Sequence, residues 1–252
     1  MIKSDLLSCD DFEDAVRSLS QIYSVDQSVI LHVTKDNWPE FTKDYTLDTF
    51  DSEYVPWLFG AHIGAKPDFN FERACYYHRA LYDGSYEWFK EGLLPAHLGT
   101  EAFLRKTAHI YPDFEKVLGL SLANVKDRSS MEGAKQGGPY AFDVLDDAKK
   151  ACRSGLDYSA PEFFCGRYWS NWSEDGRHAA TDLIEKVKNH LKPVIVKFYS
   201  NTDSKDQYIN NLWHYLFRAE EDDPDDSSHY PCTFHGGGKV VSQERIVSLI
   251  QI

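Results

Sequence analysis

Strand-like and helix-like segments alternate along this chain at irregular intervals, and this irregularity limits the folds open to it. Pro193 precedes the clearest strand-like segment, Val194–Tyr199, which is apolar except at Lys197. A doubly wound parallel sheet needs a regular alternation of strands and helices, which this spacing does not provide. The sequence therefore predicts an α+β fold. The other expected strands are Ala74–His78, Tyr140–Phe142 and a final pair formed by Tyr230–His235 and Arg245–Ile252.

Several segments show the apolar spacing of an amphipathic helix. The clearest stripe lies between Phe12 and Tyr23, and acidic residues precede it, as is favoured at a helix N-terminus. Ser85 can cap a short helix that ends at Gly92 in the left-handed conformation. The apolar run Ser28–Val33 fits either a strand or a buried helix. Further helices are expected at Glu101–Ile110, from a cap at Asp143 to about Cys152, and around Leu183–Leu191 and Tyr208–Leu216.

We predict that the chain consists of an N-terminal extension and a larger domain. Residues 1–70 contain the first helical stripe and an aromatic stretch with several Gly, Pro and Asp residues, which favours an irregular cover. Residues 71–252 contain the strand-like segments and form the predicted functional domain. Lys126–Gly138 is expected to be a loop because it is rich in charged residues and glycine, and Glu220–Asp226 because it is acidic.

The charge and the cysteines limit the class of protein. Lys and Arg occur without a basic stripe and the formal net charge is −13, so we expect no stable binding to duplex nucleic acid or to an anionic membrane. No apolar run reaches the roughly 20 residues of a membrane span, and the N-terminus lacks the apolar region of a secretory signal. The five cysteines match no disulfide pattern. These features predict a cytoplasmic location.

Two segments carry motifs that indicate a chemistry. The first is Tyr76-Tyr77-His78-Arg79, which is followed by the short helix that ends in a Gly-Leu turn. The second is Gly137-Gly138-Pro139-Tyr140, which leads into a helix containing Ala and Lys. Read in this order, they resemble the ADP-ribosyltransferase superfamily, in particular its His-Tyr-Glu branch, which includes the poly-ADP-ribose polymerases and diphtheria-type toxins. The resemblance covers roughly residues 75–152 and rests on short motifs.

The resemblance implies a split antiparallel sheet with flanking helices and a site for NAD, which this family uses as a substrate. His78 would hydrogen-bond the adenosine ribose, and Tyr140 would stack on the nicotinamide ring. Arg79 would pair with the pyrophosphate, and Gly138 would let the backbone approach the ligand. The implied reaction cleaves the nicotinamide–ribose bond and transfers ADP-ribose to an unidentified macromolecule or to water. Taken singly, each residue also fits a structural role, such as a core tyrosine or a glycine turn.

The family also places a Glu beside the nicotinamide ribose, where it stabilises the charge that develops as nicotinamide leaves. The two candidates are Glu174, in an aromatic segment, and Glu244, before the last predicted strand. The neighbours of both differ from the family pattern, so both also fit exposed carboxylates. The alternative function is therefore a non-catalytic interaction protein on the same fold that binds NAD or ADP-ribose at most.

Two other kinds of site have weaker support. His229, Cys232 and His235 have the spacing of zinc ligands, but a structural zinc site needs four ligands. No local fourth is present, so a distant residue such as His214 or Cys165 would have to supply it. We therefore expect no bound metal. Cys75 lies near His78, but proximity in sequence does not establish a catalytic dyad. The Gly-rich motifs of dinucleotide-binding and P-loop proteins and the Gly-x-Ser-x-Gly motif of hydrolases are absent.

Overall fold

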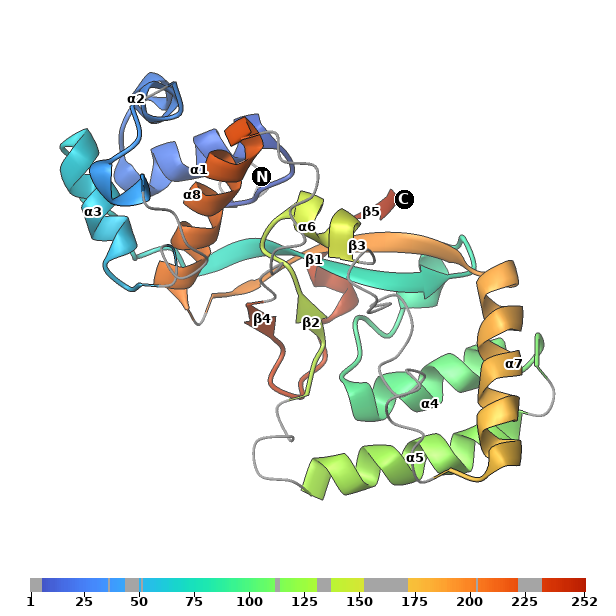
Figure 1. Cartoon of the computed structure of the whole chain (residues 1–252). Helices are drawn as coiled ribbons and strands as arrows, with labels where there is room; N and C mark the ends of the chain where they lie inside the picture. The colour runs from blue at the N-terminus through green and yellow to red at the C-terminus, as the bar shows by residue number, and fades with distance from the viewer. Residues whose placement is uncertain are drawn as a thin grey trace. The chain divides into compact units, whose positions relative to one another are not determined.

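A computed structural model describes residues 6–35, 37–43, 50, 52–111, 114–130, 137–151, 172–202, 204–221 and 233–252. Figure 1 shows helices and short sheets interleaved along the chain, which confirms the predicted α+β class. The chain forms two compact units: unit 1 comprises residues 1–77, 141–150 and 199–234, and unit 2 comprises residues 78–140, 151–198 and 235–252. Within the described ranges, no helix is long and apolar enough to cross a membrane.

The larger sheet has three strands in the order β1 (Arg73–Tyr82), β3 (Lys192–Asn201) and β5 (Ile246–Gln251). β3 and β5 are antiparallel, and Val194 lies opposite Gln251. Every residue of β3 from 194 to 198 is buried, which explains its nearly continuous apolar sequence. The strands predicted from Ala74 and from Val194 are therefore confirmed.

A smaller sheet pairs β2 (Tyr140–Ala141) with β4 (Phe234–His235). Phe142, next to β2, also forms a bridge with Tyr77 of β1. The prediction that the last two strands pair with each other is wrong, because β4 pairs with β2 whereas β5 pairs with β3. Residues 230–232 of the predicted strand lie outside the described ranges.

The core of unit 1 is aromatic and is packed between helices. The Trp213 ring stacks on Phe59 with centroids 4.0 Å apart, and its indole nitrogen donates a hydrogen bond to the hydroxyl of Tyr23. The predicted first helix is confirmed, because the Asp11 side chain accepts from the Asp14 backbone amide at its start. The helices of unit 1 are α1 (Phe12–Tyr23), α2 (Gln27–Val33), η1 (Glu40–Thr42), α3 (Val55–Ile63), α6 (Leu145–Lys150) and α8 (Lys205–Glu221).

Unit 2 has its own apolar core, which includes Leu104, Val117, Leu183 and Val187. These side chains come from three helices, of which α5 packs against both α4 and α7. The helices of unit 2 are η3 (Tyr86–Phe89), α4 (Ala96–Thr107), α5 (Phe114–Ser130), α7 (Glu174–His190) and η8 (Gln243–Arg245). The predicted short helix is confirmed as η3, with Ser85 as its N-cap and Gly92 at φ +80°.

Three local predictions need correction or completion. The ambiguous run Ser28–Val33 is helical, as part of α2. Residues 126–130 of a predicted loop continue α5, and the sequence from 120 to 130 has no Gly or Pro that would end the helix. Asp143 does not act as the predicted cap, because its carboxylate accepts from Asn211 and Thr233 instead.

Candidate functional site

Three of the sequence-predicted residues, His78, Gly138 and Tyr140, lie together in unit 2. His78 is in β1, and its Nδ1 lies 2.7 Å from the backbone oxygen of Tyr140. A carbonyl oxygen only accepts hydrogen bonds, so Nδ1 is the donor. This bond joins the two residues that the resemblance assigns to opposite ends of NAD.

The same bond sets the chemistry of the His78 ring. Burial lowers the pKa of His78, and this effect outweighs the hydrogen bond to Tyr140, which raises it. The imidazole is therefore neutral at pH 7. With the proton on Nδ1, Nε2 carries the lone pair and accepts hydrogen bonds. Nε2 has no hydrogen-bond partner among the described residues, so it keeps an unused acceptor.

The Tyr140 ring is half-buried and lies edge-to-face with His235, with centroids 5.3 Å apart and an interplanar angle of 86°. Its hydroxyl has no hydrogen-bond partner in the part of the chain that the structure describes. His235 is exposed. The pair therefore presents a partly accessible aromatic surface, which suits stacking against a ligand ring.

Two glycine segments form the backbone beside this aromatic pair. Gly138 has φ +60°, and its carbonyl accepts from the backbone amide of Gly238 at 3.2 Å. The Gly236 amide donates to the Pro139 carbonyl at 2.9 Å. A Cβ on Gly236 would lie 2.5 Å from Pro139 Cδ, so no larger residue fits there without a shift of the backbone.

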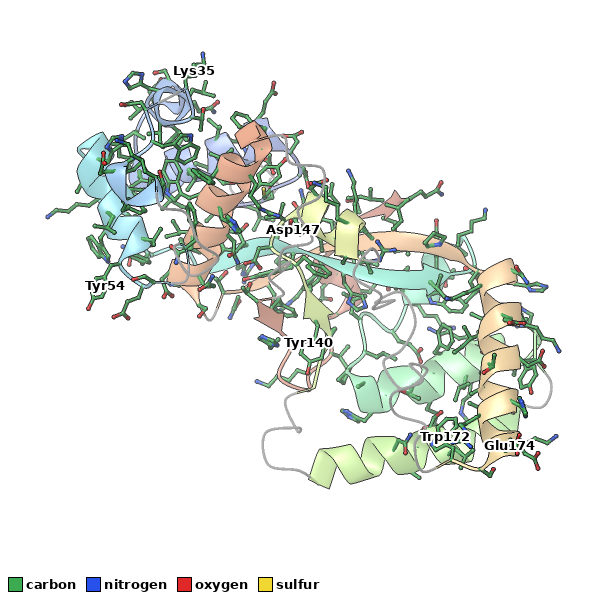
Figure 2. All side chains as sticks on the ribbon, viewed as in Figure 1. Lys35, Tyr54, Tyr140, Asp147, Trp172 and Glu174 are labelled. Carbon is green, nitrogen blue, oxygen red and sulfur yellow. The ribbon has the colours of Figure 1, made fainter. Side chains whose placement is uncertain are left out.

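The other predicted site residues do not join this cluster. Arg79 follows His78 in β1, so its side chain leaves the opposite face of the strand, and it is only 6% exposed. Glu174 is the exposed first residue of α7, and Figure 2 shows it beside Trp172 and apart from Tyr140. Glu244 is exposed in η8 and accepts from the Ser242 hydroxyl at 3.0 Å. The roles assigned to these three residues stay predictions.

The described residues add no support for the zinc site or for a catalytic dyad of Cys75 and His78. His229, Cys232 and Cys165 lie outside the described ranges, and the exposed His235 contacts Tyr140. Across the described residues, no group of three His, Cys, Asp or Glu side chains could hold a metal. Cys75 is a buried free thiol. The expectation of no bound metal stays a prediction.

No sequence pattern indicated His235 as a partner of Tyr140. The two residues are distant along the chain and meet because β2 and β4 pair. Comparisons with protein-family models, with curated proteins and with solved structures found no match to this chain.

Proposed function

We propose that this protein binds NAD or ADP-ribose at the cluster of His78, Gly138 and Tyr140, as a domain of the ADP-ribosyltransferase type with a split antiparallel sheet. The observation that carries the proposal is the hydrogen bond from His78 Nδ1 to the Tyr140 carbonyl. It leaves Nε2 as an acceptor for a ribose hydroxyl, close to an accessible aromatic ring. The order of the motifs along the chain supports the same assignment.

NAD-dependent transfer of ADP-ribose is the reaction that such a site would serve. Transfer requires stabilisation of the positive charge that develops on the ribose, which a nearby carboxylate provides. Glu174 and Glu244 are both exposed, and neither has a described contact with His78 or Tyr140. The geometry therefore supports nucleotide binding more strongly than catalysis, and the acceptor of ADP-ribose is unassigned.

Titration calorimetry with NAD and with ADP-ribose should show binding to the wild-type protein and weaker binding to two variants. His78→Asn keeps an amide donor for the Tyr140 carbonyl but removes the Nε2 acceptor. Loss of one hydrogen bond, at about 0.5–1.5 kcal/mol, corresponds to roughly a twofold to tenfold rise in Kd. Tyr140→Ala removes a stacking contact of similar value. His190→Asn, at the exposed end of α7, is the control and should bind like wild type.

Three outcomes separate the alternatives. Absence of heat at millimolar NAD and ADP-ribose would refute the proposal. Binding without release of nicotinamide would identify a nucleotide-binding protein without transferase activity. If Tyr140→Ala lowers Tm strongly while Kd is unchanged, Tyr140 is a core residue and the stacking role is wrong.

A further inference from the structure

Unit 1 contains a buried carboxylate that is held by neutral groups. Asp143 is fully buried in the turn between β2 and α6. One carboxylate oxygen accepts from Asn211 Nδ2 on α8 at 2.7 Å, and the other accepts from the Thr233 hydroxyl. No cation pairs with Asp143 in the described part of the chain. Burial of a carboxylate without a cation disfavours its charged form.

A second buried carboxylate lies one helical turn further along. Asp147 of α6 is 1% exposed, and its Oδ1 accepts from Arg218 of α8 at 2.8 Å. Its Oδ2 has no hydrogen-bond partner among the described residues. The arginine contact in this cluster is therefore made to Asp147 and not to Asp143. Figure 2 labels Asp147 on α6.

The other titratable groups around these carboxylates are neutral at pH 7. Burial raises the pKa of the Tyr208 hydroxyl on α8, and it raises the pKa of the Cys9 thiol in the N-terminal segment. Burial lowers the pKa of His214 on α8 to about 3. Cys75 and Tyr76 of β1 also raise the pKa of Tyr208. The groups that can carry charge are therefore Arg218, Asp147, whose pKa burial raises and the Arg218 contact lowers, and the ion pair of Asp146 with Lys150 on α6.

We infer that Asp143, Asn211 and Thr233 form a pH-sensitive latch, in which Asp143 takes up a proton when unit 1 folds. Asp143 follows β2 closely and Thr233 directly precedes β4, so the latch fixes the ends of both strands of the smaller sheet to α8. Loss of the proton places a charge without a cation in this buried position and destabilises unit 1, because the two hydrogen bonds that favour the charged form do not offset the cost of its burial. The inference does not depend on the ligand proposed above.

The electrostatic surroundings agree with this geometry. Burial raises the pKa of Asp143 from 3.8 to about 7; the hydrogen bonds from Thr233 and Asn211 oppose the rise, and the Asp147 carboxylate adds to it. The folded protein therefore holds more protons at this residue than the unfolded chain between about pH 4 and pH 7. Protonated Asp143 therefore gives its full contribution to stability below about pH 4, and this contribution is lost as the pH rises to about 7. Above about pH 7, stability no longer changes with the ionisation of Asp143.

Asp143→Asn isolates this effect, because an amide can accept from Asn211 and donate to Thr233, as a protonated carboxyl does. Denaturant unfolding should give similar stability for wild type and variant near pH 4. As the pH rises to about 7, the unfolding constant of wild type relative to the variant should increase on the order of a hundredfold to a thousandfold, at tenfold per pKa unit. Asp146→Asn, at the surface of the adjacent helix α6, is the matched control and should follow wild type.

Carboxyl-carbon NMR of the wild-type protein provides an independent measurement if the variant fails to fold. The assigned Asp143 signal should titrate with a midpoint near pH 7. A midpoint near pH 4, or unfolding constants for wild type and Asp143→Asn that change in parallel through the window, would overturn the inference.

Discussion

Replacement of Trp213 by alanine is expected to destabilise the protein by about 3–5 kcal/mol, the usual cost of truncating a buried aromatic residue. Trp213 is fully buried, and its ring lies almost parallel to Phe59, at an interplanar angle of 5°. The substitution removes this stack, opens a cavity and removes the hydrogen bond to Tyr23. The free energy of unfolding, measured by denaturant titration and circular dichroism, tests the prediction.

Trp57→Ala is the matched control, because Trp57 is 49% exposed on α3 of the same unit. Its removal leaves no enclosed cavity, so the loss should be within about 1 kcal/mol. Equal losses of unfolding free energy for Trp213→Ala and Trp57→Ala would show that the buried stack of Trp213 on Phe59 does not stabilise the protein.

Gly92→Ala should have the second large effect, a loss of about 2–5 kcal/mol. The left-handed backbone at φ +80° costs a residue with a Cβ about 1–2 kcal/mol. The new Cβ would also lie 2.1 Å from the Val241 carbonyl oxygen, and overpacking of this kind costs about a further 1–3 kcal/mol. The neighbouring Leu93 pairs with Val241 through two backbone hydrogen bonds, so the backbone cannot shift without loss of these bonds.

Gly64→Ala separates the two contributions. Gly64 ends α3 at φ +71°, and a Cβ there would have no neighbour within 4 Å. This variant should lose only about 1–2 kcal/mol of stability, which is the cost of the left-handed conformation for a residue with a Cβ. A loss for Gly92→Ala no greater than that for Gly64→Ala would contradict the steric argument.

The helices that could be predicted from sequence have strong local signals. α1 has a capping aspartate and a clear apolar stripe, and α7 and α8 repeat apolar residues at helical spacing. α3 was missed because its sequence, VPWLFGAHI, is apolar on every side and has no stripe. The pairing of β4 with β2 depends on contacts between distant segments, so local sequence patterns do not reveal it.

In the candidate site, too, local motifs could be predicted from the sequence, whereas contacts between distant segments could not. The motifs selected His78, Gly138 and Tyr140, and the structure brings them together. The bond that joins His78 to residue 140 uses a backbone carbonyl, which exists at every position and gives no sequence signal. His235 and the latch residue Thr233 are positioned by the fold of distant segments, so sequence patterns indicated His235 only as a zinc ligand and did not identify Thr233.

The interleaving of the two units along the chain has a consequence for experiments that use parts of this protein. Each unit is assembled from three separate stretches of sequence, and β1 and β3 both continue from one unit into the other. No single continuous gene fragment therefore encodes a complete unit. Exchange of one unit between homologous proteins would require several joints, some of them inside strands. Experiments on either unit therefore need all 252 residues of this chain.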